Sequence, residues 1–308
     1  DPALLALVFL QVSPEYQGEF LEARRLLERA AAIEDIKLQR HLAHRFGMAP
    51  SVTALGYLGD CLWMMGYPDQ ADKINNKALA FAEKIDHPMT TCYVTSRSCW
   101  LSLLEDDPEK VGTNAEVLYQ TAHKYGFKNF KFAALFFKNW LEFQKNEDGD
   151  QDLALDAMQK NIEAYYVTKT VLNRTGFLAF FAQACLEAGQ RKRGLDAINQ
   201  SILLGEETNE LWFQSEAWRI KGELIQMKED GEAVRTEALD CFKNAYRIAG
   251  EQSAKMWELR AAMSLAEYYK SQNQPKKAQR ILNDTYQWFT EGFETKELKK
   301  AQRLLSTL

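Results

Sequence analysis

The chain has 308 residues, of which 46% are hydrophobic and 26% are charged, and its net charge is −5 at pH 7. That charge argues against a general nucleic-acid-binding protein, which needs a basic surface to displace counterions from phosphates. The five cysteines are scattered, without Cys-x-x-Cys spacing. They argue against a disulfide framework or a zinc module and indicate a reduced, cytoplasmic protein.

The predicted elements are helices from one end of the chain to the other. The longest apolar run, Ala3–Leu10, is too short to cross a bilayer and lacks signal-peptide flanks, so we expect a short helix over 3–11 and no membrane partner. Further along, as in 52–63, apolar residues recur at the three- and four-residue steps of a buried helical face. Strand signals are nearly absent, and Asp-Gly-Asp at 148–150 lies between two helical patterns. Helix ends are predicted at Gly66-Tyr67-Pro68, Asp107-Pro108, Gly189 and Gln274-Pro275.

Short side chains recur along the chain at steps of 40, 43, 40, 44 and 40 residues, which indicates an internal repeat. In the alignment they open each second helix, at Ala71, Val111, Ala154, Gly194, Ala238 and Ala278. Small residues also match in the first helices, at Gly59, Cys99, Ala182, Gly222 and Ala266. One helix pair cannot bury its apolar face alone, so neighbouring pairs must stack. The pattern predicts an all-α, tetratricopeptide-like right-handed superhelix of about seven antiparallel helix pairs with a C-terminal capping helix.

The repeat favours a single α-solenoid over 1–308 in place of the two domains that the length would allow. Thr295 is placed to cap a last helix over 296–308, which we expect to cover the end of the stack. At the other end, Asp1-Pro2 leads directly into a repeat, so we expect the chain to be a fragment of a longer protein. The approximate units are 1–48, 49–90, 91–127, 128–172, 173–211, 212–254 and 255–290, followed by the cap 291–308.

Four stretches of the sequence resemble the C-terminal region of a bacterial protein family. They are His41–Gly47, Gly66–Ala71, Trp257–Ala266 and Tyr286–Thr295, of which the last two are the most specific. Members of that family fuse a class III adenylate/guanylate cyclase, or another signalling module, to a P-loop ATPase and a tetratricopeptide-like region. The resemblance implies that the chemistry belongs to the cyclase and ATPase, and that the helical region senses or docks a partner. A more distant likeness is to the helical sensor of the maltose-regulon activator.

Motifs for catalysis are absent from the sequence. It contains no GxxxxGK[ST], GxGxxG or GxSxG motif, and four histidines offer little material for a nucleophile–histidine pair. We therefore expect no enzyme activity in this chain and no cofactor. His41 and His44 share a helical face, either as metal ligands or as a surface pair, and we expect no metal. The acidic runs Glu105–Asp107 and Glu147-Asp148 are interpreted as solvated turns, and we expect no carboxylate pair in an apolar setting that would shift a pKa.

The first helices of stacked pairs are expected to line a concave groove, where a ligand or protein partner would bind. Core packing is the alternative for Trp63 and Trp100, because a one-residue error in register would bury them. For Glu216, Arg219 and Arg260 the alternatives are an ion-pair network between repeats and recognition of a ligand carboxylate or phosphate. The expected groove residues are Asp60, Trp63, Trp100, Asn139, Phe143, Gln183, Glu187, Glu216, Arg219, Glu223, Arg260 and Glu267.

Two functions remain open at this level. The first is a non-catalytic regulatory or interaction domain that binds a protein or peptide segment, including upstream catalytic domains of the same polypeptide. The second is a sensor of a small molecule or peptide that controls an attached cyclase or ATPase. Neither function involves nucleic acid or a membrane.

Overall fold

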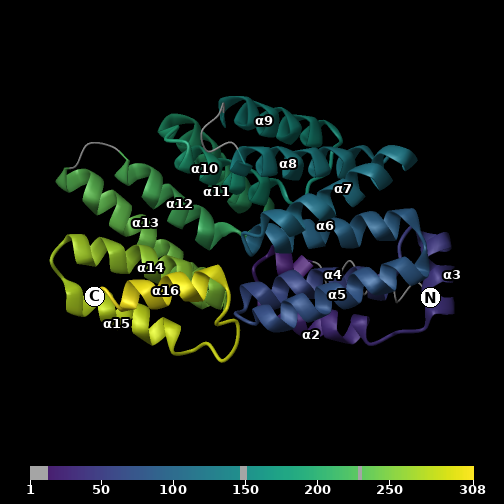
Figure 1. The fold of residues 1–308 in the computed structure, drawn as a ribbon, viewed down its shortest axis with the longest axis horizontal. Coiled ribbons are helices and arrows are strands. Elements are labelled where there is room, and N and C mark those ends of the chain that lie inside the picture. The colour runs from purple at the N-terminus through teal and green to yellow at the C-terminus, as the bar shows by residue number, and fades with distance from the viewer. Residues whose placement is uncertain (1–12, 146–150, 228–230) are drawn as a thin grey trace. The chain divides into compact units, whose positions relative to one another are not determined.

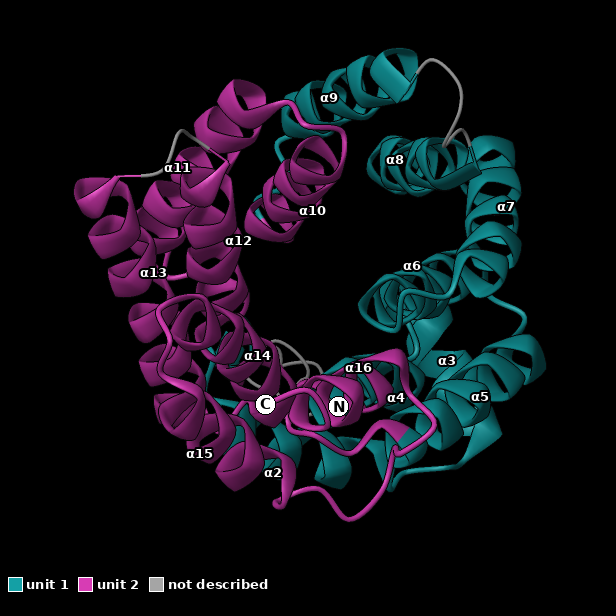
Figure 2. Cartoon of the chain, turned by 60° about the vertical axis from the view of Figure 1, so that its left-hand side comes forward, with its two compact units in different colours: residues 1–63, 69–171 teal, residues 64–68, 172–308 magenta. Residues whose placement is uncertain are grey.

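The computed structural model describes residues 13–145, 151–227 and 231–308, and the regular elements within these ranges are all helices (Figure 1). The predicted all-α fold of consecutive helix pairs is confirmed. The chain folds as two compact units, shown in different colours in Figure 2. Unit 1 holds the described residues up to Trp63 together with Asp69–Val171, and unit 2 holds Met64–Pro68 and Leu172–Leu308.

Unit 1 is built from eight labelled helices, most of them in consecutive pairs. From α6 onwards each helix packs against the next, and α6 also contacts α8, so the first helices of neighbouring pairs lie side by side. The helices are α2 (Phe20–Ala31), α3 (Ile36–Phe46), α4 (Pro50–Met64), α5 (Pro68–Ile85), α6 (Pro88–Leu104), α7 (Pro108–Tyr125), α8 (Lys128–Lys145) and α9 (Gln151–Val167).

Unit 2 continues the same pattern and ends in a single helix. Its first helices form one row, because α12 contacts both α10 and α14, while each second helix packs against the first helix of its own pair. The helices are α10 (Arg174–Glu187), α11 (Arg191–Thr208), α12 (Gln214–Gln226), α13 (Glu232–Glu251), α14 (Lys255–Ser271), α15 (Pro275–Tyr286) and α16 (Lys296–Leu305).

Helices begin and end at the predicted breaks. Pro108 and Pro275 stand in the first turns of α7 and α15, where the missing proline N–H leaves no hydrogen bond unmade. The side chain of Asp107 accepts the backbone N–H of Lys110 at 3.0 Å and so caps α7. The predicted cap Thr295 accepts the N–H of Leu298 at the start of α16, which packs against α14 and α15.

The structure differs from the sequence-based description at two helices. Residues 36–46 form the separate helix α3, which the repeat alignment did not include. Helix α6 begins at Pro88, three residues before the expected unit boundary, because His87 and Pro88 supply a cap and a first-turn proline. The expected helix over 3–11 and the Asp-Gly-Asp at 148–150 lie outside the described residues. Among the described helices, none combines the length and hydropathy that crossing a bilayer would require.

The small residues of the repeat are buried where first and second helices cross. Ala71, Val111, Ala238 and Ala278 have no exposed surface, and the helical glycines Gly194 and Gly222 are buried as well. At Gly222 the helices approach so closely that a methyl group would lie 2.5 Å from the ring of Phe242 on α13. These positions therefore fix the spacing within each helix pair.

Gly222→Ala is expected to destabilise unit 2 by about 1–3 kcal/mol, because the added methyl group overpacks the contact with Phe242. Gly250→Ala in α13 is the matched control, since a methyl group there meets no atom within 4 Å. In the control the higher helix propensity of alanine should add up to about 1 kcal/mol of stability. Urea unfolding of both variants measures the difference, and equal effects would contradict this account of the crossing.

Candidate functional site

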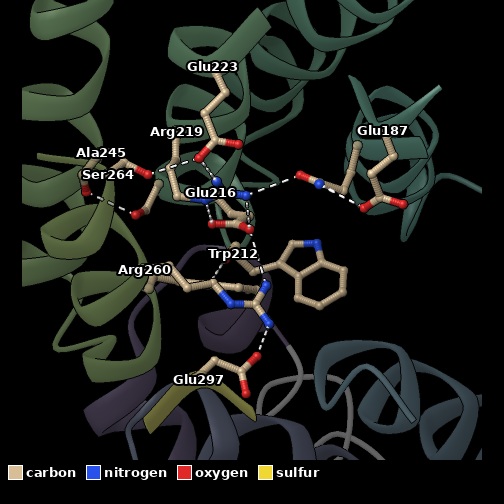
Figure 3. Close-up of polar contacts among 12 residues, drawn as sticks. Glu187, Trp212, Glu216, Arg219, Glu223, Ala245, Arg260, Ser264 and Glu297 are labelled. Atoms are coloured by element: carbon tan, nitrogen blue, oxygen red, sulfur yellow. Dashed lines mark hydrogen bonds and ion pairs between the residues drawn. The ribbon is translucent and has the colours of Figure 1, made fainter. Parts of the chain in front are cut away.

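A polar network crosses the row of first helices in unit 2. Residues at three- and four-residue spacing on α10, α12 and α14 share one helical face and point toward one another (Figure 3). We call this surface the first-helix face; it is formed by Gln183, Glu187, Glu216, Arg219, Glu223, Arg260, Ser264 and Glu267.

Glu216 is the centre of the network. Its side chain is 4% exposed, and its two carboxylate oxygens accept hydrogen bonds from Arg219 Nε at 2.7 Å and Arg219 Nη2 at 2.8 Å. Arg260 Nη1 donates to the same carboxylate at 3.1 Å from the next first helix. One buried carboxylate therefore holds two guanidinium groups and joins α12 to α14.

Further contacts extend the network to α10. Arg219 Nη2 donates to Gln183 Oε1 at 3.1 Å, and Gln183 Nε2 donates in turn to Glu187 at 2.9 Å. Arg219 also pairs with Glu223, whose carboxylate accepts the hydroxyl of Ser264 at 3.0 Å. The first helices of three successive pairs are thus connected by charged hydrogen bonds.

Arg260 links this network to the last helix. It forms an ion pair with Glu297 on α16 and lies over the ring of Trp257, with the guanidinium carbon 5.1 Å from the ring centroid. The side chain of Glu297 is 7% exposed, and its Oε2 accepts no hydrogen bond from the described residues. The network therefore ends at α16 in a buried carboxylate with one unused acceptor atom.

The ionisation of the network follows from these contacts. Burial alone would raise the pKa of Glu216, but the attraction of Arg219 and Arg260 outweighs burial and lowers it. Burial alone would lower the pKa values of Arg219 and Arg260. The attraction of their carboxylate partners outweighs burial, so both pKa values lie above the ordinary value for arginine. All three groups are charged at neutral pH, and this arrangement suits electrostatic recognition better than proton transfer.

The structure brings six of the twelve expected groove residues together in this network. They are Gln183, Glu187, Glu216, Arg219, Glu223 and Arg260. Glu267 is exposed on α14, one turn beyond Ser264, and Asn139 is half-buried on α8. Ser264 and Glu297 complete the network although no sequence pattern singled them out; the only signal for Glu297 is its place just after the cap residue Thr295.

The other four expected groove residues are inside unit 1. Trp63, Trp100 and Asp60 have no exposed surface, and Phe143 is 1% exposed. Trp100 packs edge-to-face against Phe137, with ring centroids 5.4 Å apart. The expected exposure of these side chains is therefore wrong, because all four are buried. For the two tryptophans, the alternative interpretation of packing in the core is the correct one.

Asp60 belongs to a buried charge cluster in unit 1. It pairs with Arg97 on α6, while Glu15 lies 3.6 Å from Arg97 Nη2, and all three side chains are at most 3% exposed. The guanidinium also lies over the ring of Tyr57, 4.7 Å from its centroid. Two carboxyl groups thus share one buried guanidinium, which also donates to the hydroxyl of Tyr16.

The pKa values in this cluster overturn the expectation that no carboxylate pair stands in an apolar setting. Burial raises the pKa of Asp60 to about 6 even though Arg97 attracts the charged form. Burial likewise raises the pKa of Glu15 well above its usual range, against the opposing attraction of Arg97. Both oxygens of Glu15 are buried and accept no hydrogen bond from the described residues. Desolvation is therefore the dominant influence on both acids.

Two carboxyl groups in connections between helices are also largely shielded from solvent. Glu210, 4% exposed between α11 and α12, accepts hydrogen bonds from Thr175 Oγ1 at 3.0 Å and Trp212 Nε1 at 3.1 Å. It also accepts the backbone N–H groups of Asn173 and Thr175 at the start of α10, and burial raises its pKa to about 7. Burial raises the pKa of Glu105 to about 7 as well, so the expected solvated turn at Glu105 is corrected. Glu147-Asp148 lies outside the described residues.

The histidines form no larger cluster. The ring of His44 on α3 meets His87 edge-to-face at 5.6 Å between centroids, and His87 Nδ1 caps α6 by accepting the N–H of Thr90. Within the described ranges, no three or more His, Cys, Asp or Glu side chains are grouped to hold a metal ion.

Comparison with known proteins places the fold but not the family. No protein-family model matches the chain. An uncharacterized protein of Rhizobium meliloti (strain 1021) is 22% identical over 251 residues, which are 81% of this chain and 24% of that protein. The chain therefore spans about a quarter of the length of that curated relative.

Solved structures with similar folds are helical repeat proteins. A Rap protein complexed with competence and sporulation factor matches 100% of this chain and 98% of its own, with TM-score 0.56 and 11% identity. Yeast Tom70 matches 93% of this chain and 59% of its own, with TM-score 0.53 and 13% identity. A signal transduction ATPase with numerous domains (STAND) protein with a tetratricopeptide repeat sensor, from Pyrococcus horikoshii, matches 94% of this chain and 46% of its own, with TM-score 0.51 and 10% identity. The predicted tetratricopeptide-like solenoid is confirmed.

Proposed function

We propose that the chain is a non-catalytic interaction domain that binds a peptide segment of a protein along the first-helix face of unit 2. The observation that carries the proposal is the network of Gln183, Arg219, Glu216 and Arg260, which holds the first helices of three successive pairs in one rigid row. A rigid surface costs little conformational entropy on binding. Glu187 and Glu267 are exposed along that row, where a bound segment would meet them.

The similar folds support a binding role in two ways. One is described as a Rap protein in complex with competence and sporulation factor, and another as a signalling ATPase with a tetratricopeptide repeat sensor. We propose by extension that the chain acts as the regulatory part of a cytoplasmic signalling protein, as its resemblance to cyclase–ATPase fusion proteins implies. The bound segment would then come from neighbouring catalytic domains or from a separate protein.

A sensor function is the second candidate, and the sensor named in the STAND protein favours it. A small ligand would raise the melting temperature of the isolated chain by mass action. Thermal shift measurements with sugars, nucleotides and short peptides distinguish the candidates. A shift with a sugar or nucleotide, and none with any peptide, would favour the small-molecule sensor.

Hydrogen exchange locates the proposed interaction directly. Peptides selected from a random displayed library should slow amide exchange in α10, α12 and α14 when they bind. The second helices α11, α13 and α15 provide the internal control, because they lie behind the first helices and should keep their exchange rates. Protection confined to the second helices, or failure of every peptide to bind, would contradict the proposed function.

A further inference from the structure

We propose that the exposed side of α16 in unit 2 binds an acidic peptide segment. Its binding surface, which we call the basic face, is formed by Lys296, Lys299, Lys300 and Arg303. The basic face lies opposite the side of α16 that is buried in unit 2, so it is separate from the first-helix face. Binding there goes beyond the proposed function and does not depend on it.

The spacing of charges along α16 produces the basic face. Lysine or arginine stands at the third, fourth and seventh positions after Lys296, and residues at this spacing share one side of a helix. All four side chains are exposed, whereas Leu298 and Ala301 on the other side have no exposed surface. The acid of α16, Glu297, is buried and paired with Arg260. The exposed side of α16 therefore carries only positive charges.

This arrangement lowers the stability of the helix that carries it. Like charges four residues apart repel each other, and both such pairs of the basic face, beginning at Lys296 and at Lys299, join two cations. A lysine at the first position of a helix also opposes the positive end of the helix dipole. A local cost without a compensating contact marks a position where function, rather than stability, determines the sequence.

A second helix of the same unit shows the stabilising arrangement. On α13, Arg247 pairs at 2.6 Å with Glu251, four residues further along. On α16, by contrast, Lys300 and Arg303 form no ion pair with any residue that the structure describes. Both can therefore meet an acidic partner without breaking an existing pair.

A short segment with carboxylate groups fits the basic face. The face extends over seven helical steps, or about 10 Å, which is the length of about three residues of extended chain. Lys299 already binds one carboxylate, that of the exposed Glu294 in the preceding connection, at 2.8 Å. The carboxylates of a peptide would meet Lys300 and Arg303 in the same way.

A nucleic acid or a membrane fits less well. The chain has 38 basic and 43 acidic residues, so a polyanion that extends beyond the basic face meets net negative charge. Screening acts over about 8 Å at physiological salt, so a short peptide senses mainly the four cations. The apolar side of α16 is buried within unit 2 and is not exposed for insertion into a bilayer.

Subtractive selection from a random displayed dodecapeptide library tests the proposal. The library is first depleted on the variant K300Q/R303Q and then selected on the intact chain, so that the surviving peptides require the basic face. Glutamine is as good a helix former as the residues it replaces. The control K243Q/R247Q removes two exposed cations from α13 that have acidic partners. Circular dichroism and melting temperatures confirm that both variants fold.

The surviving peptides should contain Asp and Glu at least about twofold above the input library. One of them should bind K300Q/R303Q about fivefold more weakly than the intact chain and K243Q/R247Q almost equally well, and its binding should weaken as salt is raised. It should also slow amide exchange in α16. No surviving peptides, or survivors without acidic enrichment, would overturn the proposal.

Oligothymidine and phosphatidylserine vesicles test the other partners. If either binds the intact chain more tightly than the selected peptide does, and loses that binding in K300Q/R303Q, the basic face belongs to a nucleic acid or a membrane and the proposal is wrong. None of these results decides the proposed function, which is tested by amide exchange in α10, α12 and α14.

Discussion

Glu216→Gln should lower the free energy of unfolding of the chain by about 3–5 kcal/mol. The substitution keeps the size of the side chain but removes the negative charge that Arg219 and Arg260 share. The two guanidinium groups are then left buried near each other without the carboxylate that joins them, although Arg219 still pairs with Glu223 and Arg260 with Glu297. Urea unfolding at pH 7, followed by circular dichroism, measures the loss.

Glu251→Gln is the matched control for this prediction. Glu251 forms an ion pair with Arg247 at 2.6 Å, but both side chains are more than half exposed. Solvent screens such a pair, so its removal should cost less than about 1 kcal/mol. Similar losses in the two variants would show that burial does not set the strength of the Glu216 contacts.

The effect of Glu216→Gln should also depend on pH. The folded-state pKa of Glu216 is lowered, so its contribution is present above the unfolded-state pKa, near 4.3, and is lost as the pH falls through the folded value. The difference between wild type and variant should therefore be full at pH 7 and shrink below about pH 4. A difference that grows on acidification would contradict the ionised state of Glu216.

Arg97→Met should destabilise unit 1 by about 3–5 kcal/mol at pH 8, because it leaves Asp60 and Glu15 buried without the guanidinium. Methionine retains much of the apolar volume of the arginine stem, so loss of charge is the main change. The cost should be smaller at pH 5, where both carboxyl groups can bind protons. Urea unfolding at the two pH values gives this comparison.

Glu15→Gln separates desolvation from pairing in the same cluster. The pKa values of Glu15 and Asp60 are higher in the folded state than in the unfolded state. The protonated carboxyl groups therefore contribute their full stabilisation at a pH below the unfolded-state pKa values, and this contribution is lost as the pH rises through the folded-state values. For Asp60 that loss falls between about pH 4 and pH 6. The unfolding free energy of Glu15→Gln relative to wild type should therefore rise from pH 5 to pH 8. A difference that is flat with pH would rule out a buried, proton-binding Glu15.

The fold could be predicted because its determinants are repeated. Small residues such as Gly59, Ala71 and Gly222 mark helix crossings at nearly constant intervals, and prolines mark the helix starts between them. Helix α3 was missed because it belongs to no repeat, although Asp35 caps it and Gly47, with φ of 85°, ends it. Local capping signals, read without the repeat alignment, would have found that helix.

The site could be predicted only in unit 2. There Glu216 and Arg219 are one helical turn apart, so their pairing follows from sequence spacing. In unit 1 the partners Glu15, Asp60 and Arg97 are separated by 45 and 37 residues, and no local spacing connects them. For Trp63 the sequence left groove and core both open, because aromatic side chains serve binding and packing equally well, and only the rotation of its helix decides between them.

Glu210 limits how the solenoid can be divided. The carboxyl group of Glu210 lies beyond the end of α11, 35 residues after Thr175 in the first turn of α10. It accepts the backbone N–H groups at the start of α10 that a local capping residue would otherwise bind. A truncation after Thr208 would retain every residue of both helices of this pair and still leave the first turn of α10 without its acceptor. Excision of the pair as a module should therefore run through Trp212, so that Glu210 and its indole donor are kept. The complete module extends beyond its two helices.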